Sequence, residues 1–128
     1  MTLNEIKNTL NAVVISKRGE LKERRYEERR YEEREDMNLN IARAYCADLM
    51  SDVLAFSITN SLLITHLTNT QVIRTAEIAD VKAIVFVQSK RPDIETIALA
   101  DTKNIPLFVT DLSMYETCGK LYEKGLRS

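Results

Sequence analysis

The sequence predicts an α/β protein of three layers (α/β/α), in which helices cover both faces of a small, mainly parallel sheet built from βαβ units. Three short, almost wholly apolar runs predict strands that are covered on both faces. They lie at 61–65, 83–87 and 106–109. Segments with helical spacing of apolar residues alternate with them at 71–80, 93–103 and 113–124. Such alternation, at intervals of roughly 20 residues, is typical of parallel strands joined by helices.

Signals at the helix ends support this order of elements. Pro92-Asp93 is a helix start signal, and Ser113 with Glu116 has the spacing of a capping box. Gly125 follows the last helical segment, where a C-cap glycine is expected. The three helices therefore begin and end where the βαβ units require.

The first half of the chain contains weaker patterns of the same kind. Residues 2–5 form another capping box, and a helix with a buried apolar stripe is expected after Thr2. The β-branched run at 12–15 and the segment 41–46 predict two further strands, and 48–56 predicts a helix. Within that helix we expect Asp48 to be the N-cap and Asp52 to be solvated, with paired acid and base groups as the alternative.

A charged segment interrupts this pattern and predicts a helical insertion at about 17–37. It contains the repeated unit Arg-Arg-Tyr-Glu-Glu, at 24–28 and 29–33. An exposed helix held by pairs of opposite charges is one interpretation. The other is a partner-binding arm, because interfaces favour tyrosine and arginine. Its candidate residues are Arg25, Tyr26, Arg30 and Tyr31.

Length and charge exclude several classes of protein. With 128 residues, 45% of them hydrophobic, the chain is expected to be a single domain spanning 1–128. The 18 basic and 19 acidic residues give a net charge of -1, which argues against nucleic-acid binding. No apolar run is long enough to span a membrane and no secretory signal opens the chain, so we expect a cytoplasmic protein. Cys46 and Cys118 are interpreted as small buried hydrophobic residues rather than redox groups.

The loops after the predicted strands are where a ligand would bind in a parallel sheet. They are rich in hydroxyl and amide groups, which suit a phosphate or a ribose and equally suit helix caps; we favour the caps. The candidate ligand-binding residues are Thr65, Thr68, Asn69, Thr70, Gln88, Ser89, Asp111 and Ser113.

Catalytic machinery is not recognisable in the sequence. None of the three glycines follows a core strand, so neither a dinucleotide fingerprint nor a phosphate-binding loop is present. A zinc site or a hydrolytic triad would have to use His66, the only histidine. A transferase would depend on Ser113, Lys90 and Arg91 alone. We therefore expect no enzyme, no cofactor and no metal.

About two thirds of the chain, from 44 to 126, resembles the DRTGG domain, a small α/β module related in fold to the N-terminal domain of HPr kinase. The matching stretches are 44–53, 62–70, 83–93 and 115–122. The Asp-Arg-Thr-Gly-Gly signature falls on Thr68, Asn69, Thr70, Gln88 and Ser89, so that only its threonine is retained.

The resemblance implies a regulatory role and pairing as a homodimer. We accordingly expect a non-catalytic regulatory or protein-interaction module of the stand-alone kind that docks on a protein partner. The alternative is a small-ligand sensor, which would bind an adenine nucleotide or a similar anion at the carboxyl ends of the strands.

Overall fold

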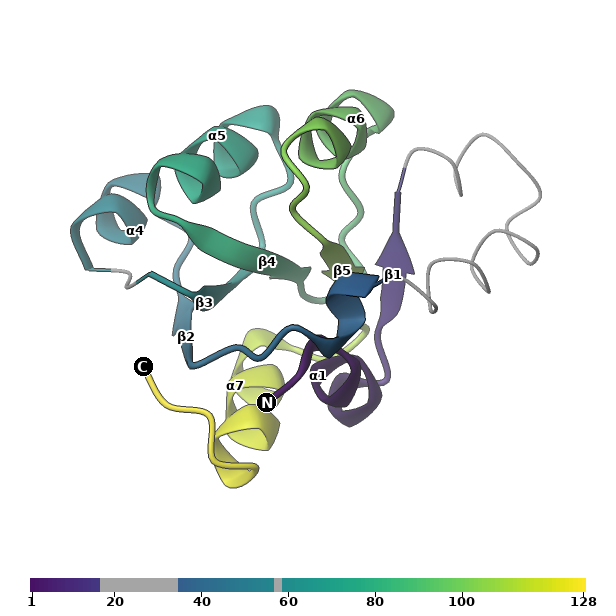
Figure 1. Cartoon of the computed structure of the whole chain (residues 1–128), viewed down its shortest axis with the longest axis vertical. Helices are drawn as coiled ribbons and strands as arrows, with labels where there is room; N and C mark the ends of the chain where they lie inside the picture. Colours follow the sequence, from purple (N-terminus) through teal and green to yellow (C-terminus); the bar gives the residue numbers. More distant parts are fainter. Residues whose placement is uncertain (17–34, 57–58) are drawn as a thin grey trace.

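Five strands form one mostly parallel sheet in the computed structural model, which describes residues 1–16, 35–56 and 59–128 (Figure 1). The sheet order is β1-β5-β4-β3-β2. Strands β2 to β5 pair in parallel, whereas β1 runs antiparallel to β5, with Val13 opposite Val109. The bounds are Val13–Ile15 (β1), Arg43–Cys46 (β2), Ser61–Thr65 (β3), Val81–Phe86 (β4) and Leu107–Val109 (β5).

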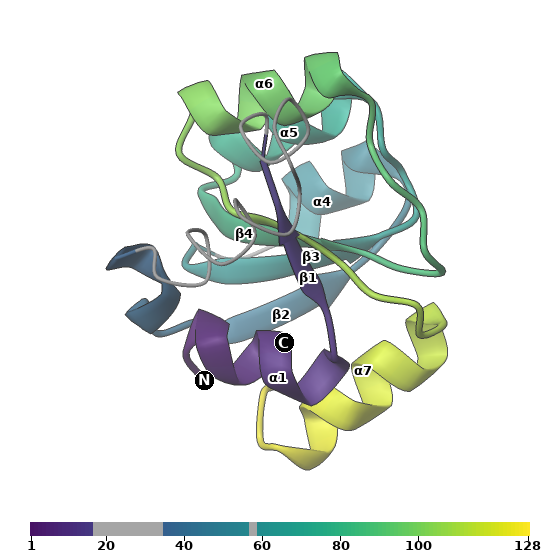
Figure 2. The same cartoon turned by 90° about the vertical axis from the view of Figure 1, so that its right-hand side faces the viewer.

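Helices cover both faces of this sheet, as the two views in Figures 1 and 2 show. Helices α4, α5 and α6 lie against one face, and α1 and α7 pack together against the other. Their bounds are Leu3–Leu10 (α1), Met50–Phe56 (α4), Thr70–Ile78 (α5), Ile94–Thr102 (α6) and Met114–Glu123 (α7). The predicted three-layer α/β fold is confirmed.

Alternation along the strands produces two hydrophobic cores. In β3, Leu62 and Ile64 belong to the core beneath α1 and α7, while Leu63 belongs to the core beneath α4, α5 and α6. Successive side chains of a strand point to opposite faces, so a strand that is covered on both faces needs apolar residues throughout. All five residues of β3 are buried, which explains its unbroken apolar sequence.

The predicted helix caps are present. Thr2 and Glu5 form the reciprocal capping box, with Thr2 Oγ1 accepting from the Glu5 N–H at 3.1 Å. Asp93 and Ser113 cap α6 and α7, each through a side-chain oxygen that accepts from a backbone N–H. A side-chain cap of this kind stabilises a helix by roughly 1 kcal/mol. Local sequence therefore determines where these elements begin.

The predicted charged insertion falls largely outside the described residues. Residues 17–34 are not described, and they include the four candidate partner-binding residues Arg25, Tyr26, Arg30 and Tyr31. The last part of the predicted insertion is a short 3-10 helix at Glu35–Asn38. Among the described residues, no helix is long and apolar enough to cross a membrane.

Candidate functional site

The topology brings four loops together at one edge of the sheet, because β2 to β5 are parallel and end on the same side. Asp48 follows β2, His66 follows β3, Gln88 and Ser89 follow β4, and Asp111 follows β5. All eight candidate ligand-binding residues lie in these loops or at the helix and strand ends that flank them. The contacts among them determine which groups remain available to a ligand.

Asp48 connects the ends of β2 and β3. Its Oδ1 accepts from the Thr65 hydroxyl at 3.0 Å and from the His66 backbone N–H at 2.7 Å. Its Oδ2 lies 2.8 Å from His66 Nδ1, which must carry the proton because an ionised carboxylate only accepts. The expectation that Asp48 is a helix cap is wrong, because its carboxylate turns to β3 instead.

The ionisation of Asp48 reflects these contacts. Partial burial raises the pKa of the carboxyl, but the donors of His66 and Thr65 outweigh this effect and lower the pKa below its ordinary value. Thr65 is fully buried, and its hydroxyl also accepts from the Leu67 N–H at 3.1 Å. Asp48 is therefore a structural group that holds two strand ends together.

The turn after β4 has an unusual backbone conformation. Gln88 and Ser89 are both left-handed, with φ of 56° and 59°. Their N–H groups donate to the carbonyls of Leu112 (2.8 Å) and Thr110 (2.9 Å), which fixes the turn against the loop after β5. The Ser89 hydroxyl donates to Asp111 Oδ1 at 2.6 Å. On the alignment inferred from the sequence, the paired glycines of the DRTGG signature fall on these two positions, and glycine is the residue best suited to this conformation.

Most of the candidate ligand-binding side chains are engaged within the protein. Asn69 caps α5, accepting from the Val72 N–H at 3.3 Å, and Ser113 caps α7, accepting from the Glu116 N–H at 3.1 Å. The capping interpretation is thus confirmed for these two residues. Thr68 and Thr70 are half-buried, and Gln88 is exposed. Ligand binding by these groups stays a prediction.

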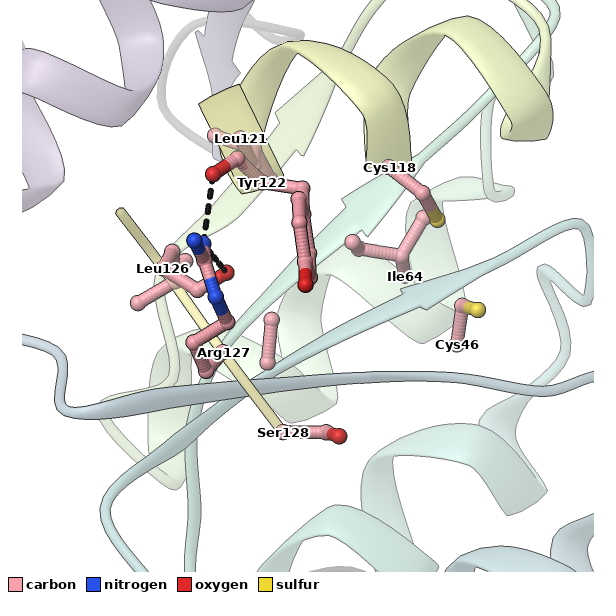
Figure 3. Close-up of a pocket in the computed structure, with 9 residues that line it drawn as sticks. Cys46, Ile64, Cys118, Leu121, Tyr122, Leu126, Arg127 and Ser128 are labelled. Carbon is pink, nitrogen blue, oxygen red and sulfur yellow. Dashed lines mark hydrogen bonds between the residues drawn. The ribbon is translucent and has the colours of Figure 1, made fainter. Parts of the chain in front are cut away.

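A cavity of about 400 Å³ lies elsewhere, at the β2 edge of the sheet on the α7 side (Figure 3). Its wall comes from β2, β3, α7 and the end of the chain. The lining residues are Ala44, Cys46, Ile64, Cys118, Leu121, Tyr122, Leu126, Arg127 and Ser128. The segment that ends the chain is held there, because the Arg127 guanidinium stacks on the Tyr122 ring at 3.6 Å and the Ala44 N–H donates to the Arg127 carbonyl at 2.9 Å.

Two thiols line this cavity together. Cys46 ends β2 and is exposed, while Cys118 lies within α7 and is half-buried, so their interpretation as buried hydrophobic residues is wrong. The Cys118 thiol donates to the Cys46 thiolate, which lowers the pKa of Cys46 to about 6 against the opposing effects of burial and of Asp48. The same contact raises the pKa of Cys118. Sequence reasoning missed this pair because only the fold brings the two residues together.

Metal binding has no obvious place in the part of the chain that the structure describes. No group of three or more His, Cys, Asp or Glu side chains there is arranged to hold a metal ion. The cysteine pair supplies two soft ligands, fewer than the four of a structural zinc site.

Comparison with known proteins gives a match in structure. No protein-family model matches the chain, and no curated protein matches it. One similar structure is the crystal structure of the CBS and DRTGG domains of the regulatory region of Clostridium perfringens pyrophosphatase, complexed with the activator diadenosine tetraphosphate. The TM-score is 0.63 and the sequence identity is 16%. The match covers 94% of this chain and 45% of that chain, so the present chain spans less than half of it. The chain has the fold of part of this regulatory region, in agreement with the resemblance to the DRTGG domain.

Proposed function

We propose that this chain is a non-catalytic regulatory domain that works as a homodimer and acts on a protein partner. The observation that carries the proposal is an apolar surface beside the edge of the sheet. Three large hydrophobic side chains of α4 and its N-terminal flank are exposed to solvent: Leu49 by 61%, Leu54 by 51% and Phe56 by 65%. We call these three residues the α4 patch.

The α4 patch lies next to β2, one of the two edge strands of the sheet. Phe56 lines a small cavity together with Arg43, Ala44 and Tyr45 of β2, so this end of the patch and the strand form one surface. The opposite side of α4 is already used, because Met50 and Val53 are buried in the core. Exposed apolar surface beyond single scattered residues marks interaction sites in proteins.

A second copy of the chain is the partner that this surface suits best. A twofold dimer joins the same patch on both subunits, so a patch of apolar residues is complementary to itself. The net charge of -1 gives two copies little mutual repulsion. The structural similarity to a regulatory region supports the regulatory role.

The test is the mass of the protein in solution, measured by light scattering or sedimentation. We expect the wild type to be a dimer and the variant Leu54→Glu/Phe56→Glu to be a monomer, because two carboxylates would have to be buried in the interface. Ile94→Glu is the matched control: Ile94 is also large and 45% exposed, but it belongs to α6. A monomeric wild type, or a double variant that stays dimeric, would contradict the proposal.

A nucleotide sensor is the second candidate. It is favoured by the diadenosine tetraphosphate bound to the similar regulatory region. The engaged side chains of Thr65, Asn69 and Ser113 count against a preformed site at the strand ends. A thermal-shift screen with adenine nucleotides separates the two: a ligand at a hundred times its Kd adds about 2.7 kcal/mol and raises the Tm by several degrees. No shift would exclude the sensor and leave the dimer untouched.

A further inference from the structure

The cavity at the β2 edge brings together the two cysteines of the chain. Cys46 is the last residue of β2, and Cys118 lies in α7; both line the cavity, and both sulfur atoms lie at the same end of it (Figure 3). We propose that Cys46 and Cys118 form a reactive dithiol, which a low-molecular-weight disulfide converts into an intramolecular disulfide. The cavity shares Ala44 and Ser128 with the surface beside the α4 patch, but the disulfide joins two cysteines of one chain, so its test does not require the dimer.

Small reagents can reach the dithiol. Cys46 is exposed, and the adjoining cavity of about 400 Å³ lies in the size range of small-molecule pockets. Its lining includes the apolar side chains of Ala44, Ile64 and Leu121, and Ile64 lies beside the sulfurs (Figure 3). The cavity can therefore hold one half of a small disulfide while its sulfur lies next to Cys46.

The two thiols have different roles. The thiolate is the attacking form in thiol–disulfide exchange, and the bond from Cys118 favours the thiolate at Cys46. Cys118 keeps its proton and is less accessible, which suits a group that reacts second. Cys46 is thus assigned as the attacking cysteine and Cys118 as the resolving one.

The reaction balances in two exchanges. The Cys46 thiolate attacks one sulfur of R–S–S–R, whose S–S bond breaks; a mixed disulfide Cys46–S–S–R forms and RS⁻ leaves. The Cys118 thiol gives its proton to the released thiolate and attacks the sulfur of Cys46. The bond between Cys46 and the reagent then breaks, and a second RS⁻ leaves and takes a proton from water. The two cysteines are oxidised, and one molecule of the disulfide is reduced to two thiols.

The product would link the edge strand to the helix that covers it. Cys46 belongs to β2 and Cys118 to α7, and the segment 126–128 lies between these elements along the same cavity. Oxidation would therefore fix β2 against α7 and close one end of the cavity. A regulatory domain could use such a link to respond to the thiol–disulfide balance around it.

The test uses the full-length reduced protein, oxidised glutathione as the reagent, and intact mass after alkylation of the remaining thiols. We expect the wild type to lose both alkylatable thiols without gaining an adduct. Cys118→Ser should instead accumulate one glutathione on Cys46, and Cys46→Ser should react more slowly than Cys118→Ser. At about pH 6.5, Cys46 of the wild type should react about five-fold faster than a cysteine with an ordinary pKa. This ratio includes the lower intrinsic nucleophilicity of a thiolate whose pKa is low.

Unfolding supplies the control for each variant. In concentrated guanidinium chloride the fold no longer sets the surroundings of the one remaining cysteine, so Cys46→Ser and Cys118→Ser should react at equal rates. Three results would each overturn the proposal: wild type that keeps both thiols, wild type that stops at the mixed disulfide, or native single variants that react at equal rates. Thermal melting of both variants in the reduced state shows whether they remain folded.

Discussion

Replacing Gln88 by glycine should stabilise the protein, because Gln88 and Ser89 are consecutive left-handed residues with φ of 56° and 59°. For a residue with a side chain, this conformation costs roughly 1 to 2 kcal/mol more than the right-handed one. Glycine carries no such cost, but it loses more conformational freedom on folding, and this loss cancels roughly 0.5 to 1 kcal/mol of the gain. The net gain expected for Gln88→Gly is therefore about 0.5 to 1 kcal/mol.

Ser89→Gly should give a smaller gain, although Ser89 has the same backbone conformation. Its hydroxyl donates to Asp111 Oδ1 at 2.6 Å, and losing such a bond costs about 0.5 to 1.5 kcal/mol. The two effects nearly cancel, so we expect Ser89→Gly to change the free energy of unfolding little. The difference between the two glycine variants thus measures the serine–aspartate bond.

Thermal melting followed by circular dichroism is the assay. A gain of 0.5 to 1 kcal/mol should raise the Tm by about 2 to 5 °C in a domain of this size. Lys90→Gly is the control: Lys90 is the next residue of the turn and is exposed, but it is not left-handed, so glycine there should lower the Tm. If Gln88→Gly lowers the Tm as much as Lys90→Gly does, the turn does not have the conformation described.

Three further predictions concern the end of β2. Asp48→Asn should destabilise the protein by about 1 kcal/mol, whereas Asp52→Asn should have little effect. Folding lowers the pKa of Asp48, so the ionised carboxylate stabilises the protein above the ordinary value of 3.8 and this stabilisation is lost as the pH falls below it. The free energies of unfolding of wild type and Asp48→Asn should therefore become equal in acid. Oxidation that links Cys46 to Cys118 closes a loop of roughly 70 residues and should raise the free energy of unfolding by up to about 4 kcal/mol, less any strain. The Tm should rise with it, and a lower Tm would contradict the prediction. In the wild type, where the pKa of Cys46 is about 6, alkylation of Cys46 by iodoacetamide should reach half its maximal rate near pH 6. In Cys118→Ala the midpoint should move to higher pH, and an unchanged midpoint would exclude a hydrogen bond from Cys118 to Cys46.

The fold was predictable because its signals are local. The strand predicted at 61–65 coincides with β3, since a doubly covered strand needs an unbroken apolar run. The helix predicted at 93–103 corresponds to α6 at Ile94–Thr102, because Asp93 caps it through the Thr96 N–H at 2.9 Å. The antiparallel pairing of β1 was not predicted, because a run of three strand residues does not encode the direction of its neighbour.

The candidate site was less predictable because its contacts join distant parts of the chain. Asp48 has the sequence context of a helix cap, and nothing local shows that the end of β3 offers it three donors. Asn69 and Ser113 were assigned correctly as caps, since a cap contacts a backbone N–H only three residues away. Residue type was therefore informative where the partner is close in sequence and misleading where the fold supplies it.

The end of β2 places two opposing influences on one thiol. Asp48, two residues beyond Cys46, disfavours the Cys46 thiolate through its negative charge, and Cys118 favours the thiolate by donating to it. The charge of Asp48 is held near β2 by β3, whereas the donor belongs to α7. Movement of α7 away from the sheet would remove the favourable contact and leave the unfavourable one. The reactivity of Cys46 is therefore coupled to the packing of α7 on β2, and the disulfide would lock that packing in place.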